Sequence, residues 1–301
     1  MTLPQTRPMA AAMCMLGAMA LLGFVDNYVA TIATEVSVWQ FLSVRMVMAV
    51  AFVAVLSWAG LGTMKPQRWW AVALRSGLVA VGMLLYFGSL AFMPIAQSLA
   101  GLFTSPIFVL LMTVLVLKQK IGPWRIIAVA IGFTGILLVL GVQDGAPGWI
   151  MVMPLAGGFF YAMGSLVTRV LCAEESTLSM LAGIMISQAI IGVIALITLA
   201  IWQPEVPDGA AGFLLRGWVW PIPSIFPYIA LQAFVSVMGV FLLIRAYQWG
   251  DASQVSVLEY SIMIFGPFFG WLLMGQIITP MMIAGIALIS VAGGIIAVRS
   301  K

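Results

Sequence analysis

The sequence predicts an all-α integral membrane protein, and three observations lead to this fold class. The chain of 301 residues is 63% apolar and 7% charged, whereas a soluble domain carries roughly 25% charged residues. Its apolar residues form continuous runs, and a run of about 20 such residues crosses a bilayer as one helix. The runs lack the alternating pattern of a membrane β-barrel. This composition also excludes a disordered chain.

Ten apolar runs follow one another along the chain, and each is interpreted as one membrane-spanning helix. Residues that break helices, mostly glycine and proline, stand at the joints between the runs. Most joints are too short to hold a domain. The predicted spans are residues 9–30, 38–58, 71–91, 95–117, 123–142, 149–170, 178–201, 224–248, 252–274 and 279–298.

The basic residues predict how the chain is oriented. Cytoplasmic loops carry an excess of Lys and Arg. With the N-terminus in the cytoplasm, only Arg216 falls on the outer side, and Arg45 is left inside a span. We therefore expect a multi-pass protein of the cell inner membrane with both termini cytoplasmic. The basic residues on the inner side are Arg7, Lys65, Arg68, Arg75, Lys118, Lys120, Arg125, Arg169, Arg245, Arg299 and Lys301.

The ten spans divide into two sets of five. A shift of 156 residues lays residues 87–120 over residues 243–276, and the spans that follow share a pattern of small residues. A unit of five spans ends on the opposite side of the membrane from where it begins, so the second unit is inserted upside down relative to the first. Such inverted repeats are typical of secondary transporters. We predict two inverted five-helix repeats, at residues 1–145 and 146–301.

Several segments resemble one known family. The stretch from Leu90 to Pro106, with Leu117-Lys-Gln-Lys120 and Gly132-Phe-Thr-Gly135, resembles the end of an EamA domain. Residues 246–253, 258–261, 270–275 and 285–293 resemble the same region in a second copy. Over nearly its whole length the chain is similar to EamA-type transporters of the drug/metabolite transporter superfamily, which implies a ten-span transporter.

Ionisable residues within spans are candidates for a functional site, because charge is costly there. Arg45 lies seven residues into the second span, and Asp26 lies equally far back from the outer loop. Folding of this hairpin puts the two side chains at one level of the membrane. Two interpretations stay open: a structural ion pair, or an arginine that holds a substrate carboxylate or phosphate. Asp26 with Gln40 and Arg45 also resembles a subgroup that includes S-adenosylmethionine and riboflavin uptake proteins.

Glu259 repeats this situation from the other side of the membrane. It lies eight residues into the ninth span, and Arg245 lies equally far back in the eighth. The two residues form a hairpin ion pair in one interpretation. In the other, Glu259 is a gate or a proton-coupling carboxylate, and the adjacent Tyr260 and Ser261 supply hydroxyl groups.

Prolines in two equivalent spans, Pro106 and Pro267, indicate a site in the middle of the membrane. Interrupted helices in matching spans of two repeats are typical of such a site, although kinking without function is an equal alternative. Polar side chains elsewhere line the cavity or bond neighbouring helices. The predicted substrate-binding residues are Glu259, Tyr260, Ser261, Arg45, Asp26, Tyr86, Gln97 and Tyr161, and further candidates for the lining are Gln188 and Gln232.

These observations predict a secondary transporter that moves a small organic metabolite across the inner membrane by alternating access. If both charge pairs form, the cavity is nearly neutral, which favours a zwitterionic, amino-acid-like or nucleoside-like substrate. The chain has no histidine and no phosphate-binding loop. We therefore expect no catalytic residue, cofactor or metal site, and no ATP hydrolysis by this chain.

The expected partners are a small-molecule substrate and the lipid bilayer, with no nucleic acid, and a homodimer is left open. One alternative is a membrane-embedded enzyme that acts on a lipid intermediate. The Glu174-Glu175 pair is its only adjacent pair of carboxylates, and no histidine accompanies it. A channel is a third alternative, but it requires a ring of like groups that the sequence does not show.

Overall fold

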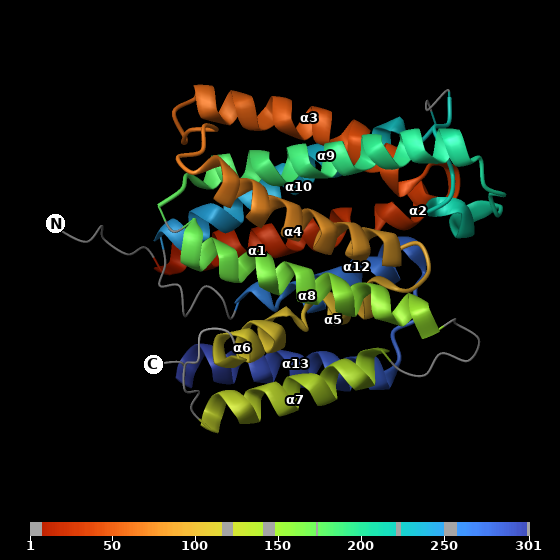
Figure 1. Cartoon of the computed structure of the whole chain (residues 1–301). Coiled ribbons are helices and arrows are strands. Elements are labelled where there is room, and N and C mark those ends of the chain that lie inside the picture. The colour runs from red at the N-terminus through yellow and green to blue at the C-terminus, as the bar shows by residue number, and fades with distance from the viewer. Residues whose placement is uncertain are drawn as a thin grey trace.

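The computed structural model describes residues 8–115, 123–140, 148–172, 174–220, 224–249 and 258–299. Its helices lie side by side along a common direction (Figure 1). The described part of the chain contains helices and no strand, which confirms the all-α prediction. The first helix begins and the last helix ends at the same end of the bundle, as an even number of crossings requires.

The helices fill the predicted apolar runs. Six segments are long and apolar enough to cross a membrane, and four shorter apolar helices occupy the other predicted runs. The total of ten crossings stays a prediction. The helices are α1 (Pro8–Val25), α2 (Tyr28–Glu35), α3 (Val38–Trp58), α4 (Trp69–Ser89), α5 (Ile95–Leu102), α6 (Ser105–Leu115), α7 (Pro123–Leu140), α8 (Gly148–Leu171), α9 (Thr177–Trp202), the short 3-10 helix η1 (Gly209–Phe213), α10 (Phe226–Trp249), α12 (Ile262–Met274) and α13 (Pro280–Arg299).

Turns interrupt three of the predicted spans. Asp26–Asn27 separates α1 from α2, Phe103–Thr104 separates α5 from α6, and Tyr260–Ser261 precedes α12. The predicted prolines lie close to two of these turns without forming them. Pro106 stands in the first turn of α6, where its missing N–H has no helical partner to lose, and Pro267 stands inside α12. The interruption of the first span was not predicted, because neither proline nor glycine marks it.

The helices pack in a pattern that recurs when the two halves of the chain are exchanged. The pair α4–α8 corresponds to α10–α1, and α4–α9 corresponds to α10–α3. Likewise α5 and α6 contact α8, as α12 contacts α1. The pairs α3–α9 and α7–α13 join equivalent helices, and Figure 1 shows them at opposite sides of the bundle. Two five-helix units related by a twofold axis would produce such a pattern, and the division into two repeats stays a prediction.

Glycines allow two of these helix pairs to approach closely. A Cβ atom on Gly82 of α4 would stand 2.8 Å from the carbonyl oxygen of Gly157 on α8. A Cβ atom on Gly135 of α7 would stand 2.7 Å from the carbonyl oxygen of Gly285 on α13. No larger side chain fits at these crossings, which is the usual way in which membrane helices achieve close packing.

At one end of the bundle, the segment after α9 docks on the end of α2 and the start of α3. Nη1 of Arg216 donates to the carbonyl oxygens of Ala33 and Val36, at 3.1 Å each. The Gln40 side chain exchanges two hydrogen bonds with the backbone of Val219, at 2.8 and 2.9 Å. Arg216, the one basic residue predicted on the outer side, thus holds the second half of the chain to the first.

At the opposite end, the loop before α4 docks on the loop between α8 and α9. The Glu175 carboxylate accepts hydrogen bonds from the backbone N–H groups of Gln67 and Arg68, at 2.9 and 2.6 Å. The Gln67 side chain donates to the carbonyl oxygen of Glu174 at 3.1 Å. The hydrogen bond from Gln67 and then that from Arg68 lower the pKa of Glu175. One member of the Glu174-Glu175 pair therefore ties two loops together.

The Glu175 contact should depend on pH. Because the folded state lowers the pKa of Glu175, the contact is stable above the ordinary pKa of a glutamate and is lost as the pH falls through the lowered value. Glu175→Gln should weaken it at neutral pH and remove this dependence. Hydrogen–deuterium exchange at residues 62–68, corrected for intrinsic rates, measures the loss of protection.

Glu174→Gln is the matched control, because Gln67 uses only the backbone carbonyl of that residue. We expect the control variant to exchange as the unmodified protein does. Equal protection of residues 62–68 in both variants would show that the Glu175 carboxylate does not hold the loop.

Candidate functional site

The interruption of the first span places two polar residues in the core of the bundle. Asp26 and Asn27 are 7% and 2% exposed. The Asn27 side chain donates to the carbonyl oxygen of Gly23 at 2.7 Å and to that of Gly266 on α12 at 3.2 Å. Since the turn removes the helical hydrogen bond that the Gly23 carbonyl would otherwise accept, Asn27 replaces it. The neighbouring Asp26 side chain remains available for other helices.

The Asp26 carboxylate is bound by both halves of the chain. The Tyr86 hydroxyl on α4 donates to Oδ2 at 2.9 Å, and Nε2 of Gln232 on α10 donates to Oδ1 at 3.2 Å. Both partners are buried. A carboxylate at this depth requires such partners, because water is not available to solvate it.

Arg45 on α3 belongs to the same cluster. Its Nη2 donates to Oγ of Ser236 at 3.2 Å, one helical turn after Gln232 on α10. The charges of Arg45 and Asp26 interact through space, although no hydrogen bond joins the two side chains in the described structure. The two charges thus lie in one cluster without a direct ion pair. Each of them bonds a residue of α10 instead.

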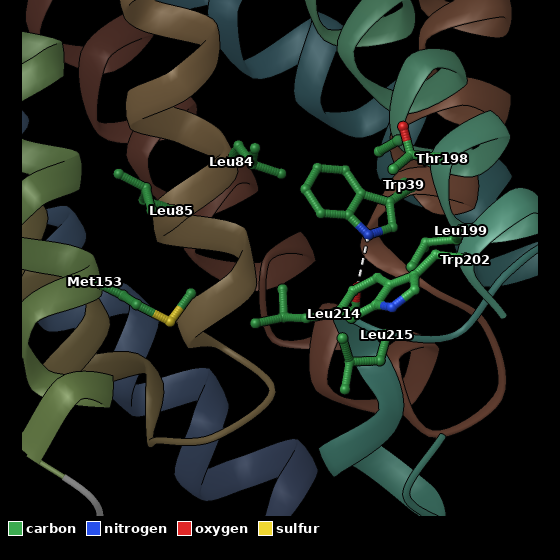
Figure 2. A pocket seen from close by; sticks show the side chains of 10 residues that line it. Trp39, Leu84, Leu85, Met153, Thr198, Leu199, Trp202, Leu214 and Leu215 are labelled. Carbon is green, nitrogen blue, oxygen red and sulfur yellow. Dashed lines mark hydrogen bonds between the residues drawn. The ribbon is translucent and has the colours of Figure 1, made fainter. Parts of the chain in front are cut away.

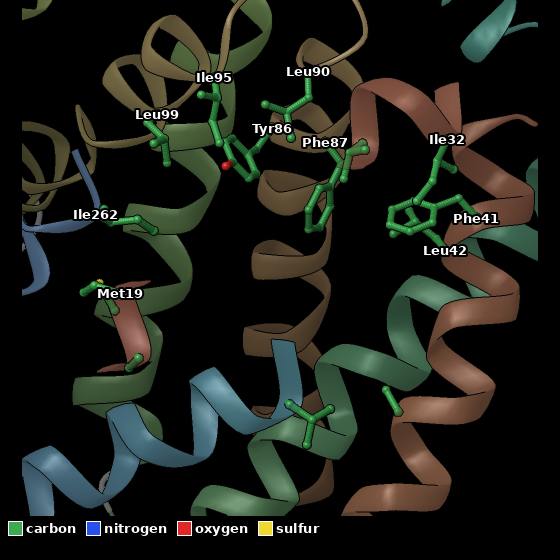
Figure 3. Packing of buried hydrophobic residues seen from close by; sticks show 14 of the residues in the cluster. Met19, Ile32, Phe41, Leu42, Tyr86, Phe87, Leu90, Ile95, Leu99 and Ile262 are labelled. Carbon is green, nitrogen blue, oxygen red and sulfur yellow. The ribbon is translucent and has the colours of Figure 1, made fainter. Parts of the chain in front are cut away.

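Aromatic rings surround the Arg45 guanidinium. Its carbon lies 4.8 Å from the ring centroid of Phe87 and 5.7 Å from that of Phe41. The two phenylalanine rings meet edge to face, with centroids 5.8 Å apart. Figure 3 shows Phe87 facing Phe41, while the adjacent Tyr86 leaves α4 on a different side. Such cation–π contacts stabilise an arginine that is removed from water.

We call the cluster of Asp26, Arg45, Tyr86, Gln232 and Ser236 the polar centre. Three of its buried atoms have no hydrogen-bond partner: Nε and Nη1 of Arg45, and Oε1 of Gln232. The orientation of the Gln232 amide is fixed, because the Asp26 carboxylate can only accept and the amide NH₂ group must face it. The polar centre therefore presents two unpaired donors and one unpaired acceptor. Buried atoms of this kind are rare in folded proteins and mark a position where a ligand or water completes the bonding.

A second group of ionisable side chains lies on α8 and at the turn before α12. Tyr161 lies on α8, and Glu259 and Tyr260 lie directly before α12. The Arg245 guanidinium carbon lies 5.3 Å from the ring centroid of Phe241, on its own helix. Residues 250–257, between α10 and Glu259, lie outside the described residues. The pair of Arg245 with Glu259, and the role of this second group, stay predictions.

Three other predicted residues lie outside the polar centre. Gln97 is buried on α5, and Gln188 is buried on α9. The Ser261 hydroxyl donates to the carbonyl oxygen of Leu258 at 2.6 Å, within its own turn. In the described part of the chain, no three Cys, Asp or Glu side chains gather as they would around a metal ion.

The sequence predictions do not include every residue of the polar centre, nor the two aromatic rings beside it. Gln232 was predicted only as a general lining residue, and Ser236, Phe41 and Phe87 were not predicted. The spacing of Gln232 and Ser236 was a usable signal, because residues four apart share one face of a helix. The aromatic residues gave no such signal, since aromatic side chains are common throughout the spans.

An apolar cleft of about 530 Å³ lies between α3, α4, α8 and α9 (Figure 2). Nε1 of Trp39 donates to the carbonyl oxygen of Leu214 at the edge of the cleft, at 2.8 Å. The cleft has no charged lining, so its chemistry differs from that of the polar centre. Its lining residues are Trp39, Leu84, Leu85, Met153, Ala195, Thr198, Leu199, Trp202, Leu214 and Leu215.

Two curated relatives share about a quarter of their residues with this chain. The riboflavin transporter of Rhizobium johnstonii is 26% identical over 218 residues, which cover 72% of this chain and 66% of the relative. The riboflavin transporter of Vibrio cholerae is 26% identical over 216 residues, which cover 71% of this chain and 67% of the relative. The matches thus span about two thirds of the length of these relatives.

Comparisons of fold and of family agree with each other. One solved crystal structure, 17% identical in sequence, superposes with a TM-score of 0.65 over 97% of each chain, which shows a shared fold. The profile of the EamA-like transporter family matches this chain twice, at residues 9–141 and at residues 148–298. The chain belongs to the EamA-like transporter family.

Proposed function

We propose that the protein is a secondary transporter that moves a small organic metabolite across the inner membrane by alternating access. The observation that supports this proposal is that both halves of the chain contribute residues to the polar centre. Asp26 and Arg45 come from the first half of the chain, and their partners Gln232 and Ser236 come from the second. Substrate sites of transporters built from two repeats lie at the interface of the repeats, near the bilayer midplane.

The same proposal includes the architecture and the orientation. The two repeats occupy residues 1–145 and 146–301, and the recurrent helix pairs and the two family matches support this division. Both termini face the cytoplasm, which the distribution of basic residues supports. The Glu175 contact then lies on the cytoplasmic side and the Arg216 contact on the outer side.

A planar heterocycle that presents a carbonyl group next to an N–H group matches the unpaired atoms of the polar centre. The carbonyl oxygen would accept from the free donors of Arg45. The N–H group would donate to Oε1 of Gln232 or to the Asp26 carboxylate. The lactam and imide edges of nucleobases and flavins have this pattern. Because two relatives are named riboflavin transporters, a flavin is the first compound to test.

A zwitterionic, amino-acid-like substrate is the second candidate. Its carboxylate would pair with Arg45 and its ammonium group with Asp26, as charge-assisted hydrogen bonds. The ammonium group has three N–H donors, so one of them would also bond Oε1 of Gln232. Both candidates therefore satisfy the unpaired atoms, and binding measurements decide between them.

Binding measurements on the purified full-length protein distinguish the two candidates. We expect riboflavin to bind and its fluorescence to be quenched. Methylation of the imide N3 should weaken binding roughly tenfold or more, because the loss of one donor leaves a buried acceptor unpaired at about 1–3 kcal/mol. Equal binding of both flavins would contradict the imide assignment. Binding of amino acids in place of flavins would assign the polar centre to a zwitterion.

Arg45→Gln tests whether the polar centre binds substrate at all. The variant lacks the charged donors, so uptake into proteoliposomes should fall by roughly 10- to 100-fold, the equivalent of about 1.5–3 kcal/mol. Arg68→Gln is the matched control, because Arg68 contributes its backbone N–H to the Glu175 contact. A folded Arg45→Gln variant with normal uptake would remove Arg45 from the site.

A further inference from the structure

One neighbour, the Asp26 carboxylate, determines how the buried amide of Gln232 is oriented. Nε2 of Gln232 donates to Oδ1 of Asp26 at 3.2 Å, and Oε1 of the same amide has no partner. An ionised carboxylate can only accept hydrogen bonds, whereas a protonated one also donates through its O–H group. The group that Gln232 turns toward Asp26 therefore depends on whether Asp26 carries a proton.

A proton on Asp26 has one position in which the neighbouring groups stay bonded. On Oδ2 it would face the Tyr86 hydroxyl, which donates to that atom at 2.9 Å. The hydroxyl hydrogen of Tyr86 would then need a new acceptor, and the described residues offer it none besides Asp26. On Oδ1 the proton faces Gln232, whose amide can turn about its last torsion and offer Oε1 in place of Nε2. Protonation on Oδ1 with a turned amide keeps both hydrogen bonds of Asp26.

The turned amide presents a different group to a ligand. With Asp26 ionised, the unpaired atoms of the polar centre are Oε1 of Gln232, which accepts, and Nε and Nη1 of Arg45, which donate. With Asp26 protonated, Nε2 of Gln232 takes the place of Oε1, so every unpaired atom is a donor. The two charges also no longer balance, because only that of Arg45 remains. The ionised centre thus suits a ligand with an N–H group, and the protonated centre suits an anion.

Arg45 keeps its position in both states, because its hydrogen bond does not involve Asp26. Its Nη2 donates to Oγ of Ser236 at 3.2 Å. The Ser236 hydroxyl donates in turn to the carbonyl oxygen of Ala233 at 3.1 Å, so its oxygen stays turned to the arginine. Gln232 is therefore the residue of the polar centre whose orientation responds to the proton.

Asp26 is the one buried acid among the described helices around it. Tyr86 and Arg45 face it within the polar centre, and both keep their protons at neutral and acidic pH. The described helices α5 and α12 carry no ionisable side chain. Glu35, the other acid of these helices, is exposed and accepts from the Ser224 hydroxyl. The remaining ionisable side chains of α1, α2, α4 and α10 are Cys14, Tyr28, Arg75, Tyr228 and Arg245.

We propose that Asp26 is the proton-coupling group and that Gln232 determines which ligand the polar centre accepts in each protonation state. This inference rests on the proposed function, in which the polar centre binds the substrate. The proton on Asp26 and the N–H group of the substrate compete, because each of them needs Oε1 of Gln232. Binding of one therefore weakens binding of the other by the same factor. Such competition is what an exchange of protons for substrate requires.

Infrared difference spectroscopy of the purified full-length protein tests the switch without any substrate. As the pH falls to about 4, the ordinary range of an aspartate, a carboxylic acid band of Asp26 should appear together with a shift of the Gln232 amide band. Asp26→Asn should remove both signals, whereas Gln232→Leu should keep the acid band and remove the amide shift. Glu174→Gln is the matched control at an exposed acid and should keep both signals. An acid band without the amide shift, or no acid band, would overturn the switch.

The pH dependence of binding tests the competition, with riboflavin as the probe. Riboflavin should bind the ionised form, so its Kd is constant at alkaline pH. Below the titration of Asp26, the Kd should rise roughly tenfold per pH unit, because one proton must leave for each ligand that binds. The amide of Asp26→Asn donates to Gln232 as the protonated acid does, so this variant should bind weakly at every pH.

The outcomes separate this inference from the proposed function. Riboflavin binding with one Kd on both sides of the Asp26 titration would overturn the competition and leave the proposed function intact. If riboflavin does not bind at any pH, the flavin assignment fails and the infrared signals decide the switch. If Asp26→Asn does not fold, loss of the amide shift in Gln232→Leu decides the infrared test.

Discussion

Two charges buried within the membrane, those of Asp26 and Arg45, impose the constraint on which the rest of the structure depends. Both side chains are buried, so protein groups must supply most of the solvation. The turn that ends α1 directs Asp26 to Tyr86 and Gln232, and α10 supplies Gln232 and Ser236 on one face. The two halves of the chain must therefore pack together before either charge is stable. The close contacts of α10 with α1 and α3 meet this requirement.

Much of the fold follows from composition and helix length. A span needs about 20 apolar residues, so the runs of the sequence predict the helices, and the fixed rise per residue places Asp26 and Arg45 at one level. The turn at Asp26–Asn27 could not be predicted in this way. No proline or glycine marks it, and it is stable because the Asn27 side chain bonds a carbonyl on α12, far away in sequence. Ser236 was missed for a related reason, since its partner Arg45 lies in the other half of the chain.

The two loop contacts differ in ways that matter for alternating access. The Arg216 contact combines several hydrogen bonds from two long polar side chains. The Glu175 contact depends on one carboxylate at the surface, where water competes for the same N–H groups. Hydrogen bonds that are exposed in this way open at low free energy. A transporter that opens one end at a time would therefore release the Glu175 end more readily than the Arg216 end.

The central claim is that Asp26 and Arg45 stabilise each other within the polar centre, and a double-mutant cycle tests it most directly. The free energy of unfolding is measured for the unmodified protein, for Asp26→Asn, for Arg45→Gln and for the double variant. Each single change should lower stability, because it leaves the opposite charge buried without compensation. The double variant should recover part of the loss, with a coupling free energy of roughly 0.5–3 kcal/mol. Losses that simply add would contradict the claim.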